Sequence, residues 1–161
     1  MLKKIKPYIL PYAVGIAIPI SVGLLSAFLT MGNMDIYTRI NTPPLAPPGF
    51  IFPIVWTLLY ILMGISSAMV YINRFNDILS ATVGLKYYAI SLLFNFGWSL
   101  IFFNSGAFLI AFIWLIFLLY FIVKSVLKYF KVKKLAALLQ IPYIIWVVFA
   151  GYLNLSITLL N

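Results

Sequence analysis

Aromatic and amide side chains are the groups in this sequence that could do chemistry, and they recur at helical spacing in three apolar stretches. The three sets are Trp56, Tyr60, Met63 and Gly64; Ser91, Asn95, Trp98 and Phe102; and Tyr143, Trp146, Ala150, Leu153 and Asn154. Because residues three or four apart share one side of a helix, each set forms one face. Three such faces would enclose a mostly apolar cavity with few hydrogen-bonding points, which is the usual composition of a small-molecule pocket.

Each face also has a purely structural interpretation. Trp and Tyr gather in belts at membrane interfaces, and buried Asn side chains often hold membrane helices together. The Ser91/Asn95/Ser99 stripe therefore fits a helix–helix seam, within one bundle or across a dimer, as well as it fits ligand contact. Trp114 has no polar companions at helical spacing, and we assign it to lipid or packing contact.

The groups that most enzymes and metal sites use are missing. The chain contains no Cys and no His, which removes thiolates, the commonest general base and the usual haem ligand. Its two acids, Asp35 and Asp77, fall in separate predicted loops, so no carboxylate pair is available. We expect no metal site and no cofactor. The apolar stretches lack charge, which argues against an ion-coupled transporter.

Composition fixes the broad class of the protein. Of 161 residues 65% are hydrophobic and 8% are charged, whereas soluble domains carry about 25% charged residues. A helix needs about 20 residues to cross the hydrocarbon core. We therefore predict an all-α integral membrane protein, a five-transmembrane-helix bundle forming a single domain over residues 1–161. Its helices are expected at about 8–31, 50–72, 86–103, 107–126 and 135–160, with a bend at Pro142.

The positions of the cations predict the topology. The net charge of +9 comes from residues that flank the apolar stretches, so lipid head groups are the expected partners and nucleic acid is not. With the N-terminus in the cytoplasm, nearly every Lys and Arg lies on that side and only Arg39 lies opposite. Arg39 is spaced to pair with Asp35 in a short helical turn. We predict a bacterial cytoplasmic membrane as the location.

Proline stiffens the segment before the second span. Five prolines lie within eleven residues, at Pro43, Pro44, Pro47, Pro48 and Pro53. The first four cannot lie inside a helix, whereas the last suits a first helical turn. The segment is either a plain turn or a shaped lid over a pocket. In the first span, small residues recur every four positions, which favours close helix packing.

Four motifs carry a resemblance to a known family. They are Pro43-x-Leu45-x-Pro47-Pro48, Pro53-Ile-Val-Trp56-Thr-x-Leu-Tyr60, Leu93-Phe-Asn95-x-x-Trp98 and Pro142-Tyr143-x-x-Trp146. Over essentially its whole length the sequence resembles the TspO/translocator protein family (tryptophan-rich sensory proteins, peripheral benzodiazepine receptor). The sequence departs from that family at Leu45 and Phe50, where Trp is usual, and it lacks the Tyr and Arg of the animal sterol motif.

The resemblance implies a five-helix bundle, commonly a homodimer, that binds porphyrins such as protoporphyrin IX in a pocket beneath the first loop. Some bacterial members are reported to degrade protoporphyrin in light with two pocket tryptophans, which here correspond to Trp56 and Trp146. Asn95, Trp98, Ala150 and Leu153 match pocket-lining positions. With the residues singled out above, the expected ligand-binding set is Leu45, Pro47, Trp56, Tyr60, Asn95, Trp98, Tyr143, Trp146, Ala150 and Leu153.

Three functions remain open at this point. The first is a membrane receptor or sensor for porphyrins and other flat apolar ligands. The second is a light-dependent porphyrin-degrading enzyme, in which Trp56 and Trp146 would be the catalytic residues. The third is a passive porphyrin transporter or an accessory subunit of another membrane complex. Without His or Cys, only weaker ligands such as Met or Tyr could bind haem iron, so a metal-free ring held by stacking suits this pocket better, which supports the first.

Overall fold

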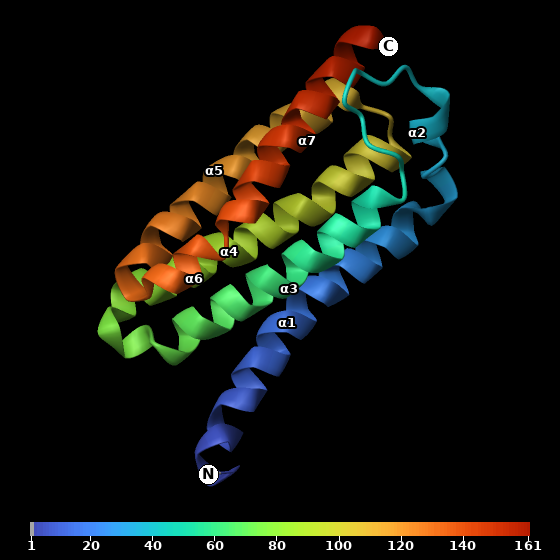
Figure 1. The fold of residues 1–161 in the computed structure, drawn as a ribbon. Helices are drawn as coiled ribbons and strands as arrows, with labels where there is room; N and C mark the ends of the chain where they lie inside the picture. The colour runs from blue at the N-terminus through green and yellow to red at the C-terminus, as the bar shows by residue number, and fades with distance from the viewer. Residues whose placement is uncertain (1) are drawn as a thin grey trace.

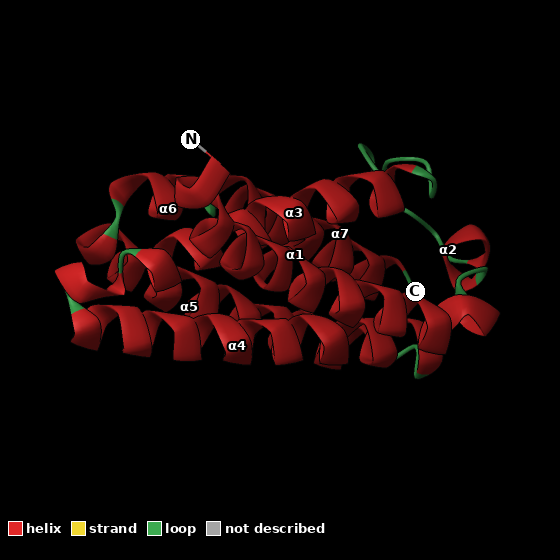
Figure 2. Ribbon diagram, turned by 90° about the horizontal axis from the view of Figure 1, so that it is seen from below, coloured by secondary structure: helices red, strands yellow, loops and turns green. Residues whose placement is uncertain are grey.

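The molecule is a bundle of long helices that run roughly along one direction. The computed structural model describes the backbone of residues 2–161 and the side chains from Tyr8 onward, and this part contains no strand (Figure 2). The long helices are α1 (Leu2–Thr30), α3 (Ile51–Ile72), α4 (Ile78–Ser99), α5 (Phe108–Val132) and α7 (Ile141–Leu160). Figure 1 places the N-terminal end of α1 and the short α6 (Lys134–Leu138) at one end of the bundle, with α2 (Ile36–Arg39) and the C-terminus at the other.

Five segments are long and apolar enough to cross a membrane. They are Tyr8–Asn33, Ile51–Ile72, Ile78–Asn104, Phe108–Val132 and Lys134–Leu160. This confirms the predicted all-α architecture of five membrane helices. The segment Ile78–Asn104 has the lowest mean hydropathy of the five, because α4 carries the polar stripe noted in the sequence.

Several predicted helix bounds are wrong: α1 begins at Leu2 instead of about residue 8, and α5 ends at Val132 instead of about residue 126. Two further differences each have a local reason. The third long helix begins at Ile78 instead of residue 86, because Asp77 caps its N-terminus by accepting a hydrogen bond from the Ser80 N–H at 2.9 Å. The last span is broken instead of bent, into α6 (Lys134–Leu138) and α7. Pro142 lies in the first turn of α7. A backbone N–H in the first turn has no acceptor within its own helix, so the N–H that proline lacks costs no hydrogen bond there.

Glycines let the backbones of α1 and α3 touch. A Cβ atom built on Gly64 would lie 2.5 Å from the Cα of Ile16, and one built on Gly15 would lie 2.7 Å from the Gly64 carbonyl oxygen. No side chain fits there. The small-residue pattern in the first span therefore predicted a real contact, which fixes α1 against α3 about midway along both helices.

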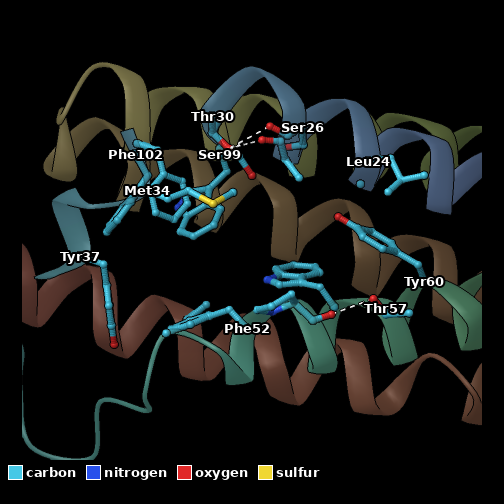
Figure 3. Close-up of a pocket in the computed structure, with 18 of the residues that line it drawn as sticks. Leu24, Ser26, Thr30, Met34, Tyr37, Phe52, Thr57, Tyr60, Ser99 and Phe102 are labelled. Carbon is cyan, nitrogen blue, oxygen red and sulfur yellow. Dashed lines mark hydrogen bonds between the residues drawn. The ribbon is translucent and has the colours of Figure 1, made fainter. Parts of the chain in front are cut away.

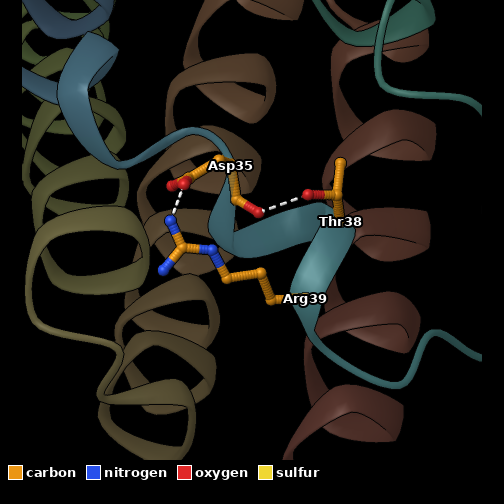
Figure 4. A network of polar contacts seen from close by, with 3 residues as sticks. All are labelled: Asp35, Thr38 and Arg39. Carbon is orange, nitrogen blue, oxygen red and sulfur yellow. Dashed lines mark hydrogen bonds and ion pairs between the residues drawn. The ribbon is translucent and has the colours of Figure 1, made fainter.

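The segment between α1 and α3 contains the short helix α2 (Ile36–Arg39). Arg39 and Asp35 form the ion pair that their spacing predicted, and Thr38 Oγ1 donates to the Asp35 carbonyl oxygen at 2.7 Å (Figure 4). Both charged side chains are more than half exposed, so the pair adds little to stability. It shapes α2 at the end of the bundle where the Pro-rich segment lies.

We expect Asp77→Ala to lower thermal stability at neutral pH more than in acid. The Ser80 N–H and hydroxyl hold the pKa of the Asp77 carboxyl below its usual value. Because the pKa of Asp77 is lower in the folded state than in the unfolded state, the carboxylate stabilises the fold at neutral pH. This contribution is lost as the pH falls through the folded-state pKa. Thermal unfolding in detergent at neutral pH and near roughly pH 3 measures the difference.

Asp77→Asn is the matched control for this experiment, because it keeps a capping side chain without the charge. It should lose less stability than Asp77→Ala at neutral pH. An equal loss for Asp77→Ala at both pH values would contradict a contribution from the charge.

Candidate ligand-binding site

A cavity of about 370 Å³ lies between α1, α3, α4 and α7 at the end of the bundle that carries the Pro-rich segment. Figure 3 shows Leu24, Ser26 and Thr30 of α1 on one side and Phe52 and Thr57 of α3 across from them. Five of the predicted ligand-binding residues line it: Trp56, Tyr60, Trp98, Ala150 and Leu153. No charged side chain of the described residues does so.

A buried polar chain holds the Tyr60 ring in place. The Tyr60 hydroxyl donates to Asn95 Oδ1 at 2.9 Å, and Asn95 Nδ2 donates to the Tyr143 hydroxyl at 3.2 Å. Asn95 and Tyr143 are almost completely buried and do not line the cavity. On the other side of Tyr60, a Cβ atom on Gly23 would lie 2.2 Å from the ring, so only Gly fits there. Asn95 and Tyr143 therefore act by orienting Tyr60.

A second chain of hydrogen bonds fixes Trp98. Its indole Nε1 donates to Asn154 Oδ1 at 3.0 Å, and Asn154 Nδ2 donates to the Phe108 carbonyl oxygen at 2.8 Å. Residues of α4, α5 and α7 thus set the orientation of one indole. The predicted polar stripe on α4 divides accordingly: Ser91 donates to its own helix at Tyr88, Asn95 joins three helices, and Ser99 lines the cavity.

The two tryptophans implied by the resemblance have different surroundings. Trp56 lines the cavity and stacks on Tyr60 with ring centroids 5.5 Å apart. Trp146 does not line it and packs edge-on against Phe52, with centroids 5.9 Å apart. The Trp146 indole N–H is buried without a hydrogen-bond partner. Phe52 lines the cavity, whereas Trp146, the second pocket tryptophan that the resemblance implied, does not.

The Pro-rich segment covers the cavity from the end of the bundle. Tyr37 lines the cavity, packs on Phe52 with centroids 5.2 Å apart, and donates its hydroxyl to the Pro47 carbonyl oxygen at 3.1 Å. Burial raises the pKa of Tyr37, which keeps this phenol neutral. Pro47 holds the segment and does not line the cavity. Leu45 has a left-handed backbone (φ 71°) and is 82% exposed, so it points away from the cavity.

Comparison with known proteins identifies the family. The model of the TspO/MBR family matches residues 15–160. The chain belongs to the TspO/MBR family. It is 38% identical over 156 residues to the tryptophan-rich protein TspO of Chlorobaculum tepidum, covering 95% of this chain and 97% of that one. It is 34% identical over 125 residues to the protein CrtK of Rhodobacter capsulatus (78% of each chain), and 32% identical over 133 residues to the translocator protein of Bos taurus (82% of this chain, 79% of that one).

Several residues around the cavity of this TspO/MBR-family chain were not predicted. They come from α1, from the segment after it, and from a π-helical turn, η3 (Leu100–Asn104), that follows α4: Ile20, Leu24, Ser26, Thr30, Met34, Tyr37 and Phe103. The spacing of Gly23 and Ala27 marked one face of α1 as a packing face, and both residues also line the cavity. The π-helical turn had no signal in the sequence.

Trp114 was predicted to contact lipid or to pack within the bundle, and in the structure it packs against α4. Its indole Nε1 donates to the Phe94 carbonyl oxygen at 2.7 Å, and its ring lies against Gly97. It does not line the cavity. Trp114 is therefore a natural control for experiments on the tryptophans near the cavity.

Proposed function

We propose that this protein is a membrane receptor or sensor that binds a flat apolar ligand of the porphyrin class in the cavity. The observation that carries the proposal is an uncharged cavity with three aromatic rings in its wall: Tyr60 and Trp98, which hydrogen bonds hold in place, and Trp56, which stacks on Tyr60. Aromatic rings stack on a flat conjugated ligand without a metal–ligand bond. The names of the relatives, tryptophan-rich sensory protein and translocator protein, support the same class.

Light-driven degradation of the ligand is the second candidate. A photo-oxidation that uses both Trp56 and Trp146 would act on a ligand that only Trp56 can touch, because Trp146 does not line the cavity and packs edge-on against Phe52. The present arrangement therefore favours binding over chemistry. Illumination of the complex tests this candidate: protein-dependent loss of the porphyrin absorption band that disappears in a Trp56/Trp146 double variant would support it.

For the location, we propose a bacterial cytoplasmic membrane with the N-terminus in the cytoplasm. Lys124, Lys128, Lys131, Lys133 and Lys134 lie around the end of α5 and the start of α6, the same end as the start of α1 (Figure 1). The positive-inside rule places this end in the cytoplasm and the Pro-rich segment outside.

We expect free-base protoporphyrin IX to quench tryptophan fluorescence saturably, with a dissociation constant that rises about three- to tenfold in Trp56→Phe. The midpoint of the titration in detergent or nanodiscs gives the constant, so the loss of one fluorophore does not bias it. Trp146→Phe should have a smaller effect, because Trp146 does not line the cavity.

Trp114→Phe is the control, since it removes an indole of the same bundle that does not line the cavity. Its dissociation constant should equal that of the unmodified protein. The same midpoint in all three variants, or quenching that never saturates, would contradict the proposal.

A further inference from the structure

The exposed residues of the cavity wall come from α1, from α3 and from the segment that joins these two helices. They are Leu24, Ala27, Met34, Gly49, Pro53 and Thr57. The cavity residues on α4 and α7 are buried or half-buried. Leu24, in the wall, is 67% exposed. The cavity therefore opens sideways, between the last two turns of α1 and the first two turns of α3.

This mouth lies at the depth of the membrane hydrocarbon. Leu24 precedes the end of α1 at Thr30 by six residues, and Thr57 follows the start of α3 at Ile51 by six, so each lies about 9 Å from its helix end. Both fall inside the segments that can span a membrane. The rim is suited to lipid, because Thr57 Oγ1 already donates to the Pro53 carbonyl oxygen at 2.8 Å.

The route from water, through the Pro-rich segment, is closed by hydrogen bonds. Asn41 and Asn161, at the end of α7, form two bonds, Asn41 N–H to Asn161 Oδ1 at 3.0 Å and Asn161 Nδ2 to the Asn41 carbonyl oxygen at 3.1 Å. The Tyr152 hydroxyl of α7 donates to the Pro44 carbonyl oxygen at 2.9 Å. With the Tyr37–Pro47 bond, these contacts tie the segment to α7 and to itself. A ligand entering from water must break several of them.

We infer that the cavity exchanges its ligand with the bilayer, through the mouth between α1 and α3, and not with water across the Pro-rich segment. The inference rests on the proposed function. It defines the ligand class further: the ligand is a molecule that dissolves in the membrane leaflet nearest the Pro-rich segment and enters the cavity laterally from that leaflet. The Pro-rich segment then serves as a fixed roof during exchange.

A thiol at the rim allows the mouth to be narrowed after folding. The chain contains no Cys, so in Ala27→Cys the introduced thiol is the one target for a maleimide. Ala27 is exposed and lines the cavity, whereas Ala17 is exposed on the same helix and does not. Ala17→Cys is therefore the matched control. Each purified variant is measured in nanodiscs before and after reaction with N-phenylmaleimide, so a folding defect cannot mimic the result.

The readout is the rate of protoporphyrin IX binding and release, followed by tryptophan quenching after mixing with loaded or empty vesicles. Labelled Ala27→Cys should bind and release about tenfold more slowly than before labelling, because a narrow port slows exchange in both directions. Labelled Ala17→Cys should keep both rates.

A second variant tests the other route. Tyr152→Phe combined with Asn161→Ala removes three of the bonds that hold the Pro-rich segment, and neither residue lines the cavity. Lateral exchange predicts unchanged rates in this variant. Faster exchange here, together with unchanged rates in labelled Ala27→Cys, would overturn the inference and leave the binding proposal standing. If no form of the protein shows saturable quenching, both proposals fall.

Discussion

Gly64→Ala should be among the most destabilising single-methyl changes in this protein. The added Cβ would lie 2.5 Å from the Cα of Ile16 and 2.7 Å from the Gly15 carbonyl oxygen. Both atoms belong to the backbone of α1, so no side-chain rotation relieves the clash, and α1 must move away from α3. Overpacking of this kind costs about 1–3 kcal/mol, and thermal or denaturant unfolding in detergent measures it.

Gly151→Ala is the matched control, because it adds the same atom to a glycine inside another membrane helix. Within the described part of the chain, no heavy atom lies within 4 Å of the position that the added Cβ would take. Ala is favoured over Gly within a helix by about 1 kcal/mol, so this variant should be neutral or more stable. Opposite signs for the two substitutions are the expected result, and equal effects would show that the contact of α1 with α3 is not tight.

Asn95→Leu should lower stability and weaken ligand binding together. The substitution keeps the size of the side chain but leaves the hydroxyls of Tyr60 and Tyr143 without their partner. A buried polar group left unpaired costs about 1–3 kcal/mol, more than a hydrogen bond itself contributes. Because Tyr60 lines the cavity, release of its ring should also raise the dissociation constant for protoporphyrin. Unfolding and fluorescence titration of the same samples measure both effects.

The triple variant Tyr60→Phe/Asn95→Leu/Tyr143→Phe separates the two causes. It removes all three polar groups, so no buried group remains unpaired, and part of the lost stability should return. Binding should stay weak, since nothing restores the orientation of the ring. A triple variant less stable than Asn95→Leu alone would contradict the interpretation that unpaired hydroxyls cause the loss.

The helices and half of the cavity wall could be predicted because their signals are local. Apolar runs of membrane length gave the five helices, and the spacing of Trp56 and Tyr60 placed both on the correct face. The start of α4 was missed because Gly84 and Lys86 interrupt the apolar run, and because the first turn depends on the Asp77 cap. In membrane helices such a cap is a weaker sequence signal than hydropathy.

The remaining wall depends on contacts between distant segments. Tyr37 reaches the cavity because the Pro-rich segment folds back toward α7, and no periodicity in the sequence encodes that path. Trp146 has the right helical face for the cavity, yet its ring packs edge-on against Phe52 and does not line the cavity. Whether an aromatic residue on the correct face touches a ligand or a neighbouring ring depends on side-chain packing across helices.

The uncharged wall of the cavity has a consequence for selectivity. The lining contains no carboxylate, imidazole, thiol or amine, and its ionisable groups are the phenols of Tyr37 and Tyr60. At physiological pH, the affinity for a ligand will then depend on the ligand's own ionisation and on its partition between water and lipid. Acidification would leave the ionisation of the cavity wall unaltered and would act on binding by changing how much of the ligand is neutral.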